Sequence, residues 1–280
     1  MIWTAGAIRP DRDLSIDVAD RTFEHGLGLF ETLRTWDGRP ALLEDHRARM
    51  VRSARALGLP LDPASLPGEE AVHRLLEAEG VPGDRRLRIT ATGGSGSGRS
   101  IVWMRSGPLP PPPGPAGARV VVGAWRVLRD DPLARHKSLN YWSRRQAHDR
   151  AGQLGCDEAV SEADGVLWEG SRTNLFAIRD GLIRTPTTSG PIVPGVMRAL
   201  VVAAARGLGL AVAEPEGIDP VEIEAADEVF LTNSVRGIIP VGRVRRLDPD
   251  GDRDWTPPGP LTRALAASIA GRLGQGARTP

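Results

Sequence analysis

Hydrophobic and polar positions follow helical spacing in some segments of the chain and strand-like alternation in others. In the segment 44–57, Met50, Ala54 and Leu57 fall on one helical face, and Gly58 follows as a stop signal. The first half predicts a hairpin over 8–18, a hairpin around the turn 36–38, helices over 44–57 and 69–79, and strands near 87–89 and 101–103.

The second half continues this mixture of elements. The Asp-Gly pairs at 164–165 and 180–181 are typical of tight hairpin turns, so three short strands are expected around them. The other predicted elements are strands over 119–125, 210–213, 229–232 and 238–244, and helices over 141–154, 195–208 and from about 261. We therefore expect an α+β fold with mostly antiparallel sheet in this half.

A proline-rich segment, Gly107 to Gly117, divides the two halves. Proline runs lack backbone donors and favour extended polyproline II, which is typical of a semi-rigid connector. The alternative is a ligand for a proline-reading domain. We favour an N-terminal α+β domain over 1–106, a linker over 107–117, and a C-terminal α+β domain over 118–280.

Composition excludes several classes of protein. Lys plus Arg number 36 and Asp plus Glu number 35, so the net charge of +1 argues against a dedicated nucleic-acid binder. No apolar run approaches the roughly 20 residues of a membrane span, and the first residues lack an apolar secretory core. One cysteine, Cys156, excludes a disulfide framework and a cysteine-built metal cluster. We expect a cytoplasmic enzyme with no metal.

The basic residues are distributed very unevenly, because 35 are arginines and one is a lysine, Lys137. Arginine stays protonated, whereas a lysine amine can act as base or Schiff-base partner. The only tyrosine, Tyr141, lies four residues further on, about one turn if the stretch is helical. The pair suggests a carbonyl-dependent site, although retention by chance is the alternative.

Other residues could complete such a site. Glu169 ends a predicted strand, where its carboxylate can point into a cavity, although an ordinary exposed glutamate is the commoner case. Pro194-Gly195-Val196-Met197-Arg198 opens a helix, whose first N–H groups and dipole favour a phosphate. Ser234 and Arg49 could add a hydroxyl and a charged contact. The glycine loop over 92–99 is interpreted as a flexible hairpin, with a phosphate cradle as the alternative.

Taken together, these motifs resemble the class IV (fold-type IV) pyridoxal-phosphate aminotransferase family. The matching stretches are Asp20-Arg21, Gly26-Leu27-Gly28-Leu29-Phe30-Glu31-Thr32, His46 to Ala54, Lys-Ser-Leu-Asn-Tyr from 137, Glu-Gly-Ser-Arg-Thr-Asn-Leu-Phe from 169, Thr185-Pro186, 194–198 and 230–241. The resemblance covers nearly the whole chain. It implies two α+β domains with the cofactor at their interface, and a homodimer.

The resemblance also implies roles for single residues. Lys137 would form the Schiff base with pyridoxal 5'-phosphate and move the proton, and Glu169 would face the pyridine nitrogen. Tyr141 would hydrogen-bond the 3′-oxygen of the cofactor. The phosphate would be held by Arg49, the backbone amides of Val196 and Met197, and Ser234.

The residues that would contact the substrate depart from the family pattern. Leu27 stands where the family has an aspartate, and Gly93 stands where its lyases often have an arginine. Phe30 lies in the first motif, and Arg34 and Arg236 are the best replacements as carboxylate binders.

The motifs leave the reaction open. Phe30-Glu31-Thr32 and the glycine loop resemble 4-amino-4-deoxychorismate lyase, which makes p-aminobenzoate and pyruvate, so we favour that activity. The alternative is a transaminase that moves an amino group from a D-amino acid, a branched-chain amino acid or an (R)-amine to a 2-oxo acid. An arginine-rich RNA-binding module is a third reading of the composition, and it predicts salt-sensitive binding of nucleic acid.

Overall fold

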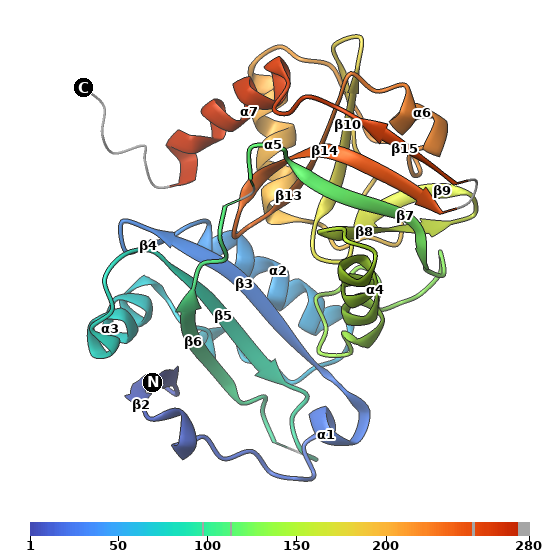
Figure 1. Ribbon diagram of the computed structural model, residues 1–280. Helices are drawn as coiled ribbons and strands as arrows, with labels where there is room; N and C mark the ends of the chain where they lie inside the picture. The colour runs from blue at the N-terminus through green and yellow to red at the C-terminus, as the bar shows by residue number, and fades with distance from the viewer. Residues whose placement is uncertain (97, 113, 248–249, 274–280) are drawn as a thin grey trace. The chain divides into compact units, whose positions relative to one another are not determined.

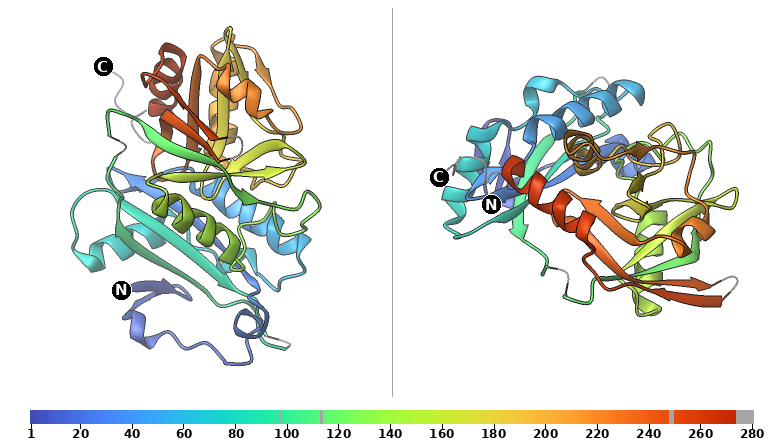
Figure 2. Two further views of the ribbon diagram at one scale, coloured as in Figure 1. Left: turned by 45° about the vertical axis from the view of Figure 1, so that its right-hand side comes forward. Right: turned by 90° about the horizontal axis from the view of Figure 1, so that it is seen from above.

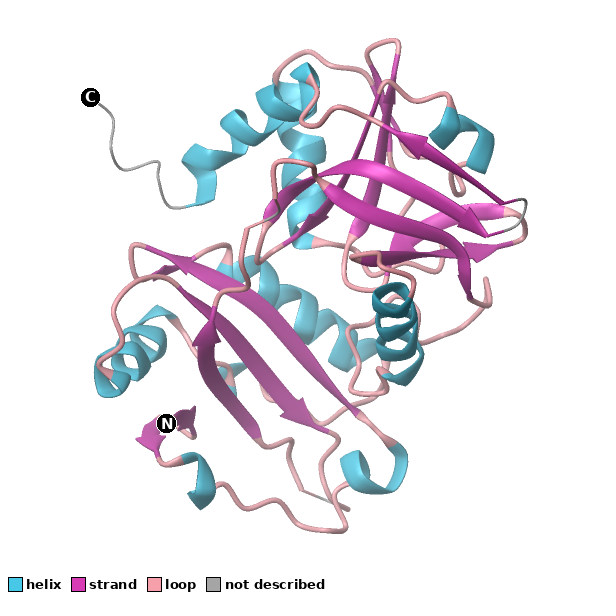
Figure 3. Ribbon diagram, in the orientation of Figure 1, coloured by secondary structure: helices cyan, strands magenta, loops and turns pink. Residues whose placement is uncertain are grey.

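The computed structural model describes residues 1–96, 98–112, 114–247 and 250–273, a mixture of helices and strands (Figures 1 and 3). Contacts within the chain divide it into two units. The first contains residues 1–110, 136–140 and 271–273, and the second contains residues 111–112, 114–135 and 141–270 of those described. Ser97 of the glycine loop and Pro113 of the proline-rich segment lie outside the described residues. The expected boundaries at 106 and 118 stay a prediction.

The first unit contains a six-stranded antiparallel sheet in the order β2-β1-β6-β5-β3-β4. Its strands are β1 (Ile2–Thr4), β2 (Ala7–Arg9), β3 (Gly28–Trp36), β4 (Arg39–Pro40), β5 (Arg85–Thr92) and β6 (Val102–Pro108). Its helices are α1 (Arg21–His25), α2 (Leu43–Ala56) and α3 (Glu69–Glu79), with 3-10 turns at Asp11–Asp13, Pro63–Ser65 and Gly271–Leu273.

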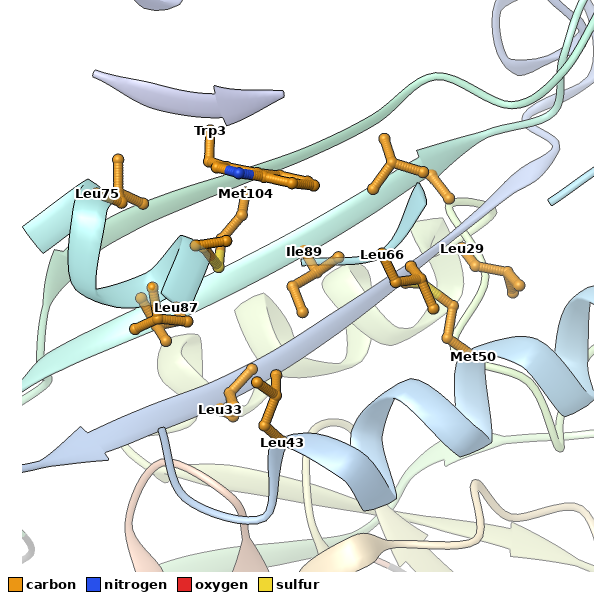
Figure 4. Close-up of a cluster of buried hydrophobic side chains, with 14 of the residues drawn as sticks. Trp3, Leu29, Leu33, Leu43, Met50, Leu66, Leu75, Leu87, Ile89 and Met104 are labelled. Atoms are coloured by element: carbon orange, nitrogen blue, oxygen red, sulfur yellow. The ribbon is translucent and has the colours of Figure 1, made fainter. Parts of the chain in front are cut away.

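Helices α2 and α3 cover one face of this sheet and form its hydrophobic core (Figures 2 and 4). Leu29 and Leu33 point toward this core because alternate residues of a strand share a face. Met50 of α2 and Leu75 of α3 pack in the same cluster. Phe30 therefore lies on the opposite face of β3.

The second unit contains a nine-stranded mixed sheet in the order β12-β11-β10-β13-β14-β7-β8-β9, with β15 paired to β14. Its strands are β7 (Ala118–Arg126), β8 (Glu158–Ala163), β9 (Val166–Gly170), β10 (Asn174–Arg179), β11 (Leu182–Arg184), β12 (Val212–Ala213), β13 (Glu228–Asn233), β14 (Gly237–Leu247) and β15 (Asp250–Asp254). A further pairing of Asn174 with Glu169 joins β10 to β9, so the strands close into a ring at these two residues.

Four helices surround this sheet: α4 (Trp142–Gln153), α5 (Val196–Gly207), α6 (Pro220–Glu224) and α7 (Pro260–Ala270). Helix α4 packs through Ala147 and Ala151 on Val121 and Ala159 of strands β7 and β8. Helices α5 and α7 pack on each other and on β13. Among the described residues, no helix combines the length and the apolar character that a membrane-crossing segment requires.

Most predicted elements are confirmed, and two expectations are wrong. The first hairpin is β1–β2, with its turn at Ala5-Gly6, because the polar segment that comes next forms a 3-10 turn instead of a strand. Four strands, not three, surround the two Asp-Gly turns. The second sheet is mostly antiparallel, as predicted, but β7 pairs in parallel with both β8 and β14, and β11 pairs in parallel with β12. Helix α4 supplies the crossover that parallel strands require.

Candidate active site

Lys137 lies in an extended segment that is hydrogen-bonded to the beginning of β3. The Phe30 N–H donates to the Lys137 carbonyl at 2.9 Å, and the Leu139 N–H donates to the Gly28 carbonyl at 2.9 Å. Gly28 has a φ of 138°, and a Cβ there would lie 2.6 Å from the Leu139 side chain. Glycine at this position is therefore required for the close approach that fixes the lysine backbone.

Phe30 lies beside the lysine on the face of β3 opposite the core. The Lys137 Nζ is 4.5 Å from the centroid of its ring, and the Arg88 guanidinium is 3.8 Å from the same centroid. Arg34, a predicted carboxylate binder, lies at the other end of β3. Its guanidinium is 3.7 Å from the Trp36 ring and 3.3 Å from an Asp84 carboxylate oxygen. The structure thus places Arg88, rather than Arg34, beside Phe30.

Arg49 is held by a buried carboxylate on the core side of β3. Its Nε and Nη2 atoms donate to the two oxygens of Glu31 at 2.8 and 2.5 Å, and His46 Nδ1 lies 2.7 Å from Oε2. Burial opposes the charge of Glu31, but Arg49 and His46 outweigh it and lower the pKa of this carboxyl to about 2. Burial also lowers the pKa of His46 below its usual value, so the ring stays neutral and donates.

The same helix face holds the residue before the lysine. Ser53, one turn beyond Arg49 on α2, has its Oγ 3.0 Å from Nδ1 of His136. Helix α2 therefore fixes both the arginine and the neighbourhood of Lys137 within the first unit.

Glu169 is buried in the second unit, where the sheet closes on itself. Its Oε1 accepts from Arg144 Nη2 at 2.5 Å and from the Val193 N–H at 3.1 Å. Its Oε2 accepts from the Asn174 side-chain amide at 3.3 Å. The residue is 2 % exposed, so it is not the ordinary exposed glutamate that was the alternative interpretation.

Asn174 connects Glu169 to the beginning of helix α5. Its amide also donates to the Val193 carbonyl at 3.1 Å. A Cβ at Gly195, the N-cap of α5, would lie 1.9 Å from the Asn174 side-chain oxygen. Glycine is thus required at 195 for the asparagine to reach both groups.

Helix α5 begins at Val196, one residue after the predicted start, and its N-terminus has no side-chain cap. The backbone amides of Val196 and Met197 therefore belong to the first helical turn, where N–H groups have no intrahelical acceptor and the dipole favours an anion. Ser234 lies in the turn between β13 and β14. Asn233 fixes this turn by accepting from the Val235 and Arg236 N–H groups at 3.0 and 2.8 Å.

Tyr141 precedes helix α4 as its N-cap and is not part of it. The stretch from Lys137 to Tyr141 is not helical, so the condition for one helical turn between them is not met, and the two residues belong to different units. The phenol donates to the Ser171 carbonyl at 2.8 Å. Burial raises the pKa of Tyr141 to about 12, so the group remains a neutral donor.

Glu158 stabilises the turn after Glu169. This buried carboxylate accepts from the backbone N–H groups of Ser171 and Arg172 and from the Thr173 hydroxyl, at 3.0, 3.2 and 3.1 Å, and also from the Ser171 hydroxyl. The turn carries the carbonyl that Tyr141 contacts, so Glu158 fixes the position of that acceptor.

A model of the family described as "Amino-transferase class IV" matches residues 28–244. The chain belongs to the class IV aminotransferase family. A putative branched-chain-amino-acid aminotransferase of Methanocaldococcus jannaschii is 31% identical over 252 residues, 86% of each chain.

Two solved structures of this family are also similar to the chain. The 4-amino-4-deoxychorismate lyase of Pseudomonas aeruginosa has a TM-score of 0.79 and 32% identity, and covers 96% of this chain and 98% of its own. The branched-chain aminotransferase of Thermoproteus uzoniensis has a TM-score of 0.85 and 28% identity, and covers 98% and 95%. The predicted fold class, a two-domain α+β fold-type IV enzyme, is confirmed.

Class IV aminotransferases depend on pyridoxal 5'-phosphate, and that cofactor is confirmed for this chain. The residues present fit it: the first unit carries the amine and a fixed arginine, and the second carries a buried carboxylate and an uncapped helix N-terminus. Among the described residues, no group of three or more His, Cys, Asp or Glu side chains could hold a metal ion.

The sequence analysis assigned no individual role to five residues that contact the predicted site residues: Glu31, His46, Arg88, Arg144 and Asn174. Two signals could have found some of them. Glu31 alternates with Leu29 and Leu33 and so occupies a core position, where a carboxylate requires a partner. His46 and Arg49 lie three residues apart on α2, the spacing at which helical side chains share a face.

Replacing Glu31 with glutamine should reduce the loss of stability in acid. Its pKa falls from 4.5 to about 2 on folding, so its stabilisation is complete above about pH 4.5 and is lost as pH falls toward 2. The pKa of His46 is also lowered on folding, so its contribution to the stability of the fold is likewise lost as pH falls below 6.5. Urea unfolding of the cofactor-free chain between about pH 7 and 3 should show a flatter profile for Glu31→Gln.

The variant should also be less stable at neutral pH, by about 3–5 kcal/mol, because the charge of Arg49 loses its buried partner. Glu44→Gln is the matched control, since Glu44 lies on α2 with its side chain 78% exposed. Equal slopes for the wild type and Glu31→Gln would contradict the interpretation.

Proposed function

We propose that this chain removes the proton from the amino-bearing carbon of an anionic substrate, and that this substrate is 4-amino-4-deoxychorismate. Loss of enolpyruvate then gives p-aminobenzoate and pyruvate. The observation that carries the proposal is the Lys137 amine, which backbone pairing with β3 holds beside Phe30, whose ring Arg88 also contacts. The Phe30-Glu31-Thr32 motif and the similarity to the Pseudomonas lyase support the substrate.

Lys137 is the proposed base. A free lysine amine has a pKa of about 10.4 and so binds its proton tightly at neutral pH, and burial in general lowers the pKa of a lysine. The amine is half-buried, and the Phe30 ring and the backbone pairing with β3 restrict its position. No other lysine in the sequence can substitute for it.

Pyridoxal phosphate supplies an aldehyde that condenses with an amine and a ring that accepts an electron pair. In the proposed site, Glu169 would face the pyridine nitrogen, and Tyr141 would turn its single O–H from the Ser171 carbonyl to the 3′-oxygen. Arg49, the Val196 and Met197 amides and Ser234 hold the phosphate. Arg88, or Arg236 in the turn after Ser234, binds a substrate carboxylate.

A transaminase is the second candidate function, and the Methanocaldococcus and Thermoproteus relatives favour it. The two reactions share the first proton transfer to Lys137 and differ in the fate of the amino group. A transaminase passes this group to a 2-oxo acid, whereas the lyase keeps it on the aromatic product. The homodimer and the cytoplasmic location expected from the sequence stay predictions.

The purified chain, loaded with pyridoxal phosphate, should convert 4-amino-4-deoxychorismate to p-aminobenzoate and pyruvate. Fluorescence of p-aminobenzoate and a coupled pyruvate assay measure the two products in parallel. A separate reaction supplies D-alanine, L-leucine or an (R)-amine with 2-oxoglutarate, and glutamate formation is monitored. Glutamate without p-aminobenzoate would replace the lyase with the transaminase.

Borohydride reduction of the loaded chain should place the pyridoxyl group on Lys137, as peptide mapping by mass spectrometry will show. Lys137→Arg keeps the positive charge but cannot form the adduct or release a proton. It should lose activity by at least about a hundredfold. Lys137→Ala is the second variant. An adduct elsewhere in either wild type or variant would remove Lys137 from its proposed role.

Arg88→Gln should raise KM for the anionic substrate by about tenfold or more, since charge-assisted hydrogen bonds contribute about 1.5–3 kcal/mol. Initial rates across substrate concentrations separate KM from kcat. Arg86→Gln is the matched control, because Arg86 lies two residues away on β5 and is exposed. Equal KM values for the two variants would exclude Arg88 as a carboxylate binder.

A further inference from the structure

Arg144, on helix α4, is the cationic partner of Glu169. Its Nη2 lies 2.5 Å from Oε1 of the carboxylate, and the two side chains are 12% and 3% exposed. Burial opposes the charge of Arg144, but the Glu169 carboxylate outweighs it and raises the pKa of the guanidinium. The contact is therefore a buried ion pair and not a screened surface contact.

Several further contacts hold Arg144 in this position. The same Nη2 donates to the Ala134 carbonyl at 3.2 Å, and the guanidinium lies 5.5 Å from the Trp125 ring and 5.9 Å from the Tyr141 ring. A backbone carbonyl, a tryptophan and a tyrosine thus contact the cation in addition to Glu169. An arginine held in this way acts as a fixed charge.

The two oxygens of Glu169 have different environments. Oε1 accepts from the cation and from the Val193 N–H, whereas Oε2 accepts from the neutral amide of Asn174. A carboxylate beside a fixed cation binds a proton more weakly than an isolated one. The ion pair therefore lowers the proton affinity of the Glu169 carboxylate, and so favours leaving a shared proton on the group that Glu169 faces.

We propose that Arg144 is a positioning residue that keeps the Glu169 carboxylate ionised, so that the proton shared with the pyridine nitrogen of pyridoxal phosphate stays on the nitrogen. The inference rests on the proposed role of Glu169 at that nitrogen. Without Arg144, the carboxylate would be a buried anion without its cation, and the shared proton would move from nitrogen to oxygen. The ring would then withdraw electrons less strongly, and proton removal by Lys137 would slow.

The test measures the protonation of the ring nitrogen directly. Wild type, Arg144→Gln, Arg144→Lys and Arg145→Gln are loaded with [15N]pyridoxal phosphate, and solid-state 15N spectra are recorded at one neutral pH. Arg145 is the matched control, because it lies next on α4, is 67% exposed and pairs with Asp149. We expect the 15N resonance of Arg144→Gln to move to the position of unprotonated pyridine, with a lower kcat and little change in KM.

Arg144→Lys should keep the wild-type resonance, because the cation remains, and Arg145→Gln should keep it as well. Circular dichroism of the cofactor-free chains checks folding, and Arg144→Met takes the place of the glutamine variant if the latter does not fold. A wild-type resonance in the neutral variant would overturn the role of Arg144. Glu169→Gln separates the role of Arg144 from the role of Glu169. If the 15N resonance is unchanged in Glu169→Gln as well, the proposed role of Glu169 at the pyridine nitrogen is wrong.

Discussion

Both units of the chain depend on one kind of interaction, a buried carboxylate paired with an arginine. Glu31 holds Arg49 in the first unit, and Arg144 holds Glu169 in the second. Removing such charges from water costs several kcal/mol per ion, and only good geometry with extra hydrogen bonds offsets that cost. His46 supplies the extra donor in the first unit, and Asn174 and Val193 supply it in the second. The pairs therefore fix orientation more than they add stability.

The two sheets explain why these pairs occur where they do. Because side chains alternate along a strand, Glu31 lies on the core side of β3 and Phe30 on the other side. One short segment therefore contacts both Arg49, through Glu31, and Lys137, through Phe30. In the second unit, the ring of strands closes at the Glu169–Asn174 pair, where Gly195 leaves room for the asparagine. Lys137 lies in the long connection between β7 and α4, and its backbone pairing with the beginning of β3 fixes it there.

The sequence predicted the helices and most strands because their hydrophobic periodicity is local. It did not specify non-local pairings such as the two parallel partners of β7. It was wrong where Leu14, Ile16 and Val18 alternate without forming a strand. The order of the motifs predicted a candidate site made of Lys137, Glu169 and the N-terminus of helix α5. It could not identify Arg144 or Arg88, because their partners, Glu169 and Phe30, are 25 and 58 positions away in the chain. Arg198 is likewise buried, beside Glu214, although arginine side chains are mostly exposed.

The contrast between lysine and arginine now has a structural explanation. Arg49 and Arg144 have tasks that require a permanent charge in a fixed plane, since each pairs with a carboxylate that burial would otherwise neutralise. Lys137 has a proposed task that requires the opposite property, an amine that can lose its proton and regain it. A composition of 35 arginines and one lysine is compatible with both. Arginine can replace lysine wherever only charge is needed, and the proposed role of Lys137 is one for which charge alone would not suffice.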